Sequence, residues 1–383
     1  MLEIKTQQIE LSEKSLPAKI QFQKVTDHQT EKMKIDQRTN ELKQHLDEAK
    51  LSIGDKLGIL WKTTAAKMHP LRTAIMKNLI HPSTKTFTQE KLSKDEELNS
   101  VFIDQNQMID ELVKKREVDP IKIHTEDHHQ LAGWVIKASS PDRPTMVMVS
   151  GNLATAELIF ESAQNYSKKH DINVLIYNPR GVVQSLGKER STQQAVTDCE
   201  AATRYALENL CQNDPRKLAV YGHSLGGGVT ATALKRMVKK GELPSDGIGL
   251  YVNSNSFSSL QGFLKGISGT LIKNERALNH LETIFKRTLQ AIRLNTLDSE
   301  KAIKKGIARQ VVIFTADNDE VILKHGRLGE RFTTTEKIKV FTATMFTPNG
   351  ELAHNQDHQY LQNNEYNDLI DKWVNLVKEQ NVA

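Results

Sequence analysis

Residues 217–234 read KLAVYGHSLGGGVTATAL, and this stretch decides the expected fold. Its first five residues form an apolar run typical of a buried strand, and the residues from Val229 onward are typical of a helix. The five residues 222–226, GHSLG, lie between them and place a serine on a sharp strand-to-helix turn. Glycines at both ends of this pattern let the flanking backbone pass close by. We therefore predict that Ser224 is a nucleophile.

Short apolar runs alternate with helical stretches from about residue 118 onward. This alternation indicates a mainly parallel sheet with helices on both faces, so the predicted fold class is α/β. The first two runs are expected to form an antiparallel pair joined by a polar turn. The eight expected strands are residues 121–124, 131–138, 145–150, 173–177, 217–221, 249–253, 310–315 and 339–342.

The chain divides into two regions of different character. Residues 1–117 are polar and poor in glycine, and we expect a helical N-terminal region whose third helix covers residues 94–116. The bound partner of this region is unknown. Residues 118–383 are expected to form the α/β domain, in which residues 261–297 form a helical cap insertion.

Composition restricts the class of protein and its location. The first twenty residues mix charges throughout, and no stretch approaches the roughly 20 apolar residues that a membrane span needs. We expect a cytoplasmic protein, or one secreted without a cleaved signal peptide, which includes delivery into a host cell. The two cysteines, Cys199 and Cys211, have no metal-ligand spacing. We predict no metal, no cofactor and no binding of nucleic acid.

Acids and histidines follow Ser224 in the order that enzymes with such a turn use, namely serine, acid and then histidine. Asp319 and Asp317 come directly after the strand 310–315, and we favour Asp319 as the residue that orients the histidine. His354 and His358 lie in the loop after the last strand. We favour His354 as the general base and keep His358 as the alternative.

Acyl transfer by a serine also needs two backbone donors for the negative charge that develops on oxygen. One should be the N–H of Leu225, which follows the nucleophile. The other should come from the loop after the strand 145–150, and Asn152 is the preferred donor.

Several segments of the α/β region resemble the serine-hydrolase branch of the α/β-hydrolase fold, close to its BEM46-like and acyl-hydrolase members. The similarity lies in Ser150-Gly151-Asn152, in YNPRGVVQSLG (177–187), in NSFSSL (255–260), in ADNDEVI (316–322) and in Ala353-His354-Asn355. The fourth of these segments aligns the acid of that family with Asp319. Val183 stands where the family has a glycine, so the backbone of that loop is expected to differ. The run Asn178-Pro179-Arg180-Gly181-Val182 also resembles uncharacterised hydrolase-like effectors of intracellular bacteria.

The resemblance implies a serine hydrolase that cleaves a carboxylic ester or another acyl bond through an acyl-enzyme. Two alternatives stay open: a peptidase or amidase of the same fold, and a non-catalytic binding module that keeps the hydrolase fold. An intact set of serine, acid and histidine argues against the second.

Substrate choice is expected to depend on the cap insertion. Residues 261–308 contain nine Lys and Arg against four Asp and Glu, with apolar residues between them, while the whole chain has a net charge of +5. Such a segment suits a lipid or other ester substrate and peripheral contact with an anionic membrane. A solvated helical face with no membrane role is the alternative interpretation.

Overall fold

The computed structural model describes residues 96–380, except residues 153, 190, 269–273, 292–296 and 348–351. The helices expected before residue 96 lie outside this described part. The longer helices are α6 (Glu96–Lys114), α7 (Phe160–His170), α8 (Thr192–Asn209), α9 (Leu225–Lys240), α10 (Leu260–Ser268), α11 (Glu275–Ala291), α12 (Ser299–Ile303) and α13 (Asn364–Gln380).

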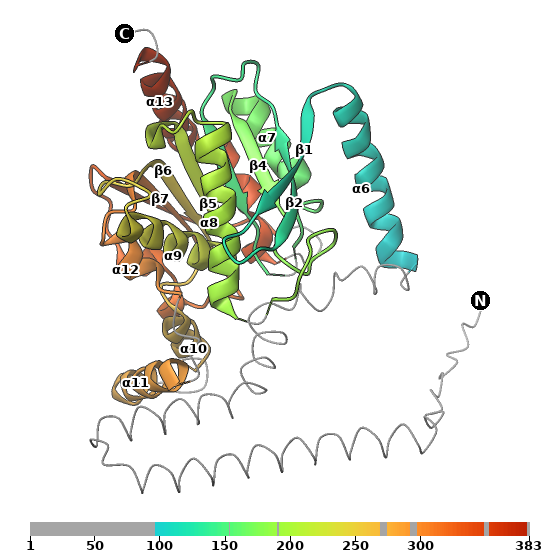
Figure 1. The fold of residues 1–383 in the computed structure, drawn as a ribbon. Coiled ribbons are helices and arrows are strands. Elements are labelled where there is room, and N and C mark those ends of the chain that lie inside the picture. The colour runs from blue at the N-terminus through green and yellow to red at the C-terminus, as the bar shows by residue number, and fades with distance from the viewer. Residues whose placement is uncertain are drawn as a thin grey trace, which may run out of the picture. The chain divides into compact units, whose positions relative to one another are not determined.

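An eight-stranded sheet forms the centre of the described part (Figure 1). Its strands are β1 (Val118–His124), β2 (Gln130–Ile136), β3 (Thr145–Val149), β4 (Asn173–Tyr177), β5 (Leu218–His223), β6 (Ile248–Ser254), β7 (Ala308–Ala316) and β8 (Ile338–Ala343). Their spatial order is β1-β2-β4-β3-β5-β6-β7-β8. The pairings of β2 with β1 and β4 are antiparallel, and all others are parallel. The predicted α/β class and all eight predicted strands are confirmed.

Helices cover both faces of the sheet because alternate residues of its buried strands point to opposite sides. In β3, Met146 and Met148 belong to the apolar cluster that includes side chains of α7 and α13. Val147 belongs to the opposite cluster, with side chains of α8, α9 and α12. A parallel sheet covered in this way presents the carboxyl ends of its strands along one edge, where loops are free to carry functional groups.

Helix α6 falls within the predicted third helix and packs on the α/β domain. Ile109 is buried in the same cluster as α7 and α13, and Leu112 and Val113 pack against that cluster. Met108, by contrast, is 36% exposed. It directly precedes Ile109 in the helix, about 100° round the axis, and thus points away from the face that meets the sheet.

The predicted cap contains two helices, α10 and α11, that follow β6. The segments that join them to each other and to the next element include residues outside the described part. Among the described residues, no helix is both long and apolar enough to cross a membrane.

Cys199 and Cys211 are both free thiols that lie in the interior. Burial raises the pKa of each thiol to about 12. Neither group is therefore ionised at neutral pH, and both behave as small apolar side chains.

Candidate active site

Ser224 lies on the turn between β5 and α9, with φ of 52° and ψ of −119°. Positive φ is costly for a residue with a side chain, and it persists here because the neighbouring backbone leaves no alternative. A Cβ at Gly222 would lie 2.7 Å from the carbonyl oxygen of Gly226, and one at Gly226 would lie 2.6 Å from that of Ser150. The two glycines of the GHSLG pattern thus permit a turn that lifts the serine out of the sheet.

A continuous path of hydrogen bonds joins the serine to a histidine and an acid. His354 Nε2 lies 2.8 Å from Ser224 Oγ, and His354 Nδ1 lies 2.8 Å from Asp319 Oδ2. All three side chains are buried. With its proton on Nδ1 donated to the carboxylate, the imidazole has Nε2 available to accept the proton of the serine hydroxyl.

The loop after β7 holds Asp319 in the orientation that this path needs. Its second oxygen, Oδ1, accepts the backbone N–H groups of Val321 and Ile322 at 2.8 and 2.7 Å. The other candidate, Asp317, is exposed and accepts the hydroxyl of Thr344 at 2.8 Å. The structure therefore brings Asp319 to the histidine and leaves Asp317 at the surface. The side chain of His358 lies outside the described part.

The two segments that carry the predicted oxyanion donors approach the serine from different sides. Leu225 is the first residue of α9, and the N–H groups of the first helical turn have no acceptor within the helix. On the other side, Gly151 is so close that a Cβ there would lie 3.0 Å from the Cβ of Ser224. Asn152 follows Gly151 directly. Their roles as oxyanion donors stay a prediction.

Asn178, at the end of β4, holds the segment that follows this loop. Its side-chain oxygen accepts the backbone N–H of Ala156 at 2.9 Å, and its amide nitrogen donates to Glu157 Oε1 at 3.0 Å. Burial raises the pKa of Glu157, while the bonds from its own backbone, Asn178 and Thr155 lower it by less. The position of the candidate oxyanion loop therefore depends on buried polar contacts and not only on apolar packing.

Asn255 connects the loops that carry the acid and the histidine, a role that the sequence did not reveal. It follows β6 with φ of 45°, a conformation that asparagine tolerates better than most residues. Its Nδ2 donates to the carbonyl oxygen of His354 at 3.0 Å. Its Oδ1 accepts the backbone N–H of Ala316 at 3.0 Å and the hydroxyl of Tyr360 at 2.7 Å. One amide therefore fixes the histidine loop to the end of β7.

Arg327 holds the acid loop from the other side. This buried guanidinium donates to three backbone carbonyl oxygens, those of Ile322, Asp317 and Asp319, at 2.8, 2.9 and 3.0 Å. The three acceptors surround the turn that carries the Asp319 side chain. Arg327 is therefore a positioning residue of the candidate site.

Replacing Arg327 with methionine is expected to lower the free energy of unfolding by about 2–3 kcal/mol, since buried carbonyl groups lose their donor. We expect kcat for ester hydrolysis to fall by about 10- to 100-fold as well, because the acid loop loses its fixed position. Urea denaturation and initial rates measure the two effects. Arg331→Met is the matched control, since Arg331 is exposed and donates to one carbonyl oxygen. Equal stability of the two variants would contradict this role.

Arg180, from the loop after β4, is fully buried between two carboxylates. Its Nε and Nη2 donate to Asp198 Oδ1 at 2.8 and 2.6 Å, and its Nη2 also donates to Asp127 Oδ1 at 2.8 Å. The bond from Arg180 holds the pKa of Asp127 well below its ordinary value. This network joins the β1–β2 turn, the β4 loop and α8. Removal of Arg180 would leave the buried negative charge of Asp198 uncompensated.

Val183 has a left-handed backbone, with φ of 47°. The expected difference between this loop and that of the family stays a prediction. A β-branched residue in this region is strained, and its side chain gains burial in return. It packs with Val182 and with Phe102 of α6 in a small apolar cluster. The side chain of Val183 thus connects the loop after β4 to α6.

Within the described ranges, no group of three or more His, Cys, Asp or Glu side chains is arranged to hold a metal ion.

Comparison with known proteins gives one family and several distant relatives. The sequence profile of the family described as Chlamydia CHLPS protein (DUF818) matches residues 57–252. The polyketide transferase GrgF of a Penicillium species is 28% identical over 116 residues, which are 30% of this chain and 39% of GrgF. This chain therefore matches about two fifths of the length of that curated relative.

Among the solved structures with similar folds are two that are 16% and 17% identical to this chain. An α/β hydrolase from Vibrio vulnificus gives a TM-score of 0.49, with 70% of this chain and 85% of that chain covered. The esterase Pf2001 from Pyrococcus furiosus gives 0.46, with 68% and 90% covered. The sheet described above, with a strand–turn–helix at its centre, is the α/β-hydrolase fold that the sequence predicts.

Proposed function

The chain belongs to the Chlamydia CHLPS protein (DUF818) family, and we propose that within it the protein is a serine hydrolase that cleaves a carboxylic ester or another acyl bond. One observation carries this proposal, the hydrogen-bonded path from Ser224 Oγ through His354 to Asp319. The positive φ of Ser224 at a strand-to-helix turn supports it, because this is the geometry of a nucleophile elbow.

In the proposed first step, Ser224 Oγ attacks the carbonyl carbon of the substrate while its proton passes to His354 Nε2. Asp319 stabilises the imidazolium that forms. The oxyanion is held by hydrogen bonds from the N–H groups of Leu225 and Asn152. Such hydrogen bonds stabilise negative charge most strongly where water is excluded. The intermediate then collapses to an acyl-enzyme, and His354 returns the proton to the departing alcohol.

In the second step, His354 Nε2 takes a proton from water, which attacks the carbonyl carbon of the acyl-enzyme. His354 then returns that proton to Ser224 Oγ as the bond between Oγ and the acyl carbon breaks, and the acid is released. The same residues would act on a thioester or an amide, so a peptidase or amidase would use the same machinery. Transfer of the acyl group to an acceptor other than water is a second candidate. The match to a relative named as a polyketide transferase favours it.

A screen of p-nitrophenyl esters, thioesters and peptide amides, with and without an added acceptor alcohol, tests the proposal. We expect His354→Ala to lose about 10⁴- to 10⁶-fold in kcat, as removal of a base from such a set does. His358→Ala should stay within about threefold of the unchanged protein. Loss of activity in the second variant alone would move the base to His358. Inactivity of the unchanged protein on every substrate would favour a non-catalytic module.

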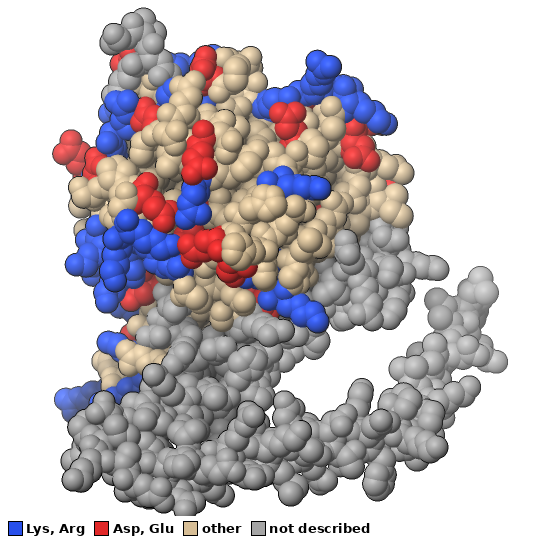
Figure 2. All heavy atoms as spheres, viewed as in Figure 1, with Lys and Arg blue, Asp and Glu red and all other residues tan. Residues whose placement is uncertain are grey.

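The cap supports a lipid or other apolar ester as the substrate. Ile267 of α10 and Ile284 of α11 are 42% and 44% exposed. Close to the cap in sequence, Lys301, Lys304 and Lys305 are exposed at α12, and Figure 2 shows basic side chains gathered around that helix. Exposed apolar groups together with basic ones favour contact with an anionic membrane.

Flotation with vesicles that contain anionic phospholipid tests this contact. At low salt we expect the protein to float with the vesicles, and Ile284→Glu to lower the partition coefficient about tenfold because an apolar insertion is lost. Ile103→Glu on α6 is the matched control, since Ile103 is 46% exposed. Absence of flotation at low salt, or equal loss in both variants, would remove the membrane role and leave a solvated cap.

A further inference from the structure

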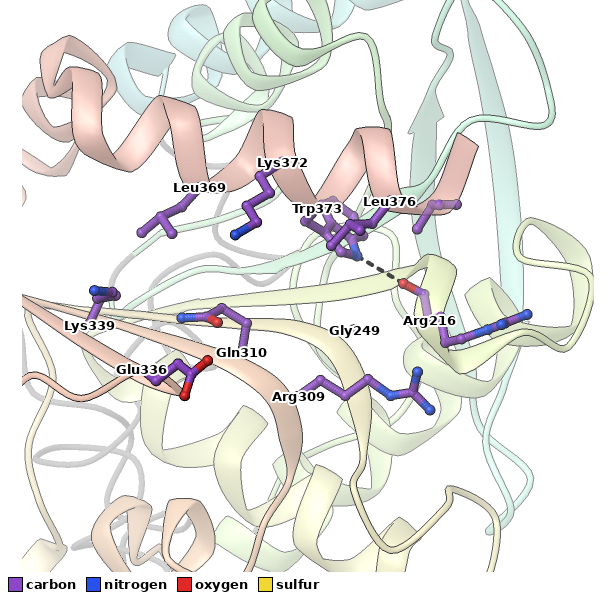
Figure 3. Close-up of a pocket in the computed structure, with 11 residues that line it drawn as sticks. Arg216, Gly249, Arg309, Gln310, Glu336, Lys339, Leu369, Lys372, Trp373 and Leu376 are labelled. Carbon is purple, nitrogen blue, oxygen red and sulfur yellow. Dashed lines mark hydrogen bonds between the residues drawn. The ribbon is translucent and has the colours of Figure 1, made fainter. Parts of the chain in front are cut away.

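A cavity separate from the candidate active site lies at the edge of the sheet opposite to Ser224. Its volume is about 430 Å³, within the range of small-molecule pockets. Gly249, Gln310 and Lys339 contribute to it from the first residues of β6, β7 and β8, and α13 covers it (Figure 3). Ser224 follows the carboxyl end of β5, which pairs in parallel with β6, so the two sites lie at opposite edges of the same sheet.

Most of the charge in the cavity lining is positive. Four basic side chains contribute, and Glu336 is the acidic one among the lining residues. Two of the four are already paired outside the cavity, Arg216 with Asp214 and Arg309 with Asp246. The other two are Lys339 and Lys372. Neither has an ion pair within the described part of the chain, so both are available to an anion.

Gln310 adds a donor that is not used. Its Nε2 atom is buried and has no hydrogen-bond partner among the described residues. In Figure 3, Lys372 extends from α13 toward Gln310 on β7. A buried amide N–H without an acceptor costs about 1–3 kcal/mol, which a ligand oxygen would recover. Two ammonium groups and an amide N–H are all donors, so the group that satisfies them is an acceptor.

The remaining wall of the cavity is apolar and comes from α13. It consists of Trp373, Leu376, Leu369 and Val377. The indole N–H of Trp373 donates to the carbonyl oxygen of Arg216 at 2.8 Å, which fixes the ring (Figure 3). A Cβ at Gly249 would lie 2.6 Å from that indole nitrogen, so the ring lies on the strand only because residue 249 is glycine.

We propose that this cavity binds a small amphiphile with one negative charge, an aliphatic monocarboxylate in chemical class. The carboxylate would lie between Lys339, Lys372 and Gln310, and the aliphatic part along Trp373 and Leu376. Glu336 in the same lining disfavours a doubly charged head such as phosphate, because like charges repel. This site does not depend on the proposed hydrolase activity.

Isothermal titration of the full-length Ser224→Ala protein with octanoate tests the proposal without turnover. The informative variant adds Lys339→Glu and Lys372→Glu. The matched control adds Lys115→Glu and Lys122→Glu, two exposed lysines outside the cavity lining, so both proteins have the same net charge. Octanamide replaces octanoate as the neutral probe, and inorganic phosphate tests an anion without an apolar part. Far-UV circular dichroism checks that both proteins are folded.

We expect octanoate to bind the control at least tenfold more tightly than the variant, which corresponds to about 1.4 kcal/mol. Binding should weaken at high salt because the lysines are accessible to solvent. Octanamide should bind more weakly than octanoate. Equal affinity of the two proteins, or no binding to either, would overturn the proposal. If octanamide bound as tightly as octanoate, the charged head would have no part in recognition and the proposal would be overturned. If phosphate bound more tightly than octanoate, the apolar part would have none, and the proposal would be overturned as well.

Discussion

Replacing Ser224 with alanine is expected to abolish labelling by a fluorophosphonate probe and to reduce kcat for ester hydrolysis by about 10⁴- to 10⁶-fold. Both losses have one cause, the removal of the oxygen atom that attacks the carbonyl of the substrate, or the phosphorus of the probe, in the proposed mechanism. His354 and Asp319 remain in place but have no nucleophile to act on. In-gel fluorescence measures the labelling, and release of p-nitrophenol measures the rate.

Ser139→Ala is the matched control, because Ser139 is exposed and its backbone N–H donates to Asp171. It should label and hydrolyse as the unchanged protein does. Equal labelling of the Ser224 and Ser139 variants would exclude Ser224 as the nucleophile. Absence of labelling in every form, the unchanged protein included, would favour a binding module.

Replacing Asp319 with asparagine is expected to reduce kcat by about 10⁴-fold, the size of effect that loss of the orienting acid has in a serine protease. The side-chain oxygen of asparagine can still accept the N–H groups of Val321 and Ile322. The amide nitrogen then faces His354 Nδ1 and donates to it. This forces the imidazole proton onto Nε2, which can no longer accept the proton of Ser224.

Asp317→Asn is the matched control for this experiment, since Asp317 is an exposed acid of the same loop whose carboxylate bonds only to Thr344 among the described side chains. We expect its kcat to change by less than about threefold. Loss of activity in Asp317→Asn with activity kept in Asp319→Asn would reverse the assignment. Unfolding midpoints of both variants show whether a lost rate reflects chemistry or stability.

The sequence predicts the fold because its signals are local. Each buried strand is a short apolar run, and the GHSLG pattern joins β5 to α9 within a few residues. The order of Ser224, Asp319 and His354 in the chain follows from the same local signals, because each lies directly after a strand or in the loop beyond one. Carboxyl ends of parallel strands share an edge, so these residues are expected near one another.

Asn255 and Arg327 were not found because their role depends on partners that sequence does not identify. Asn255 bonds to the carbonyl oxygen of a residue 99 positions away, and every residue has such a carbonyl. The acceptors of Arg327 are likewise backbone groups. When a side chain bonds to the backbone, its partner can be any type of residue. The sequence then contains no complementary side chain that would reveal the contact. Val183 shows the same limit, since only the structure reveals Phe102 against it.

His354 lies 130 residues after Ser224 and follows β8, the strand at the edge of the sheet. A ribosome therefore completes the nucleophile elbow long before it supplies the base. Domains of a growing chain begin to fold from their N-terminal side, so β3, β5 and β6 can pair around an elbow that has no proton acceptor. Chemistry would begin only when the last strand has joined the edge and its loop has closed over Ser224. Under the proposed mechanism, synthesis itself would thus delay activity until β8 and the loop that carries His354 are in place.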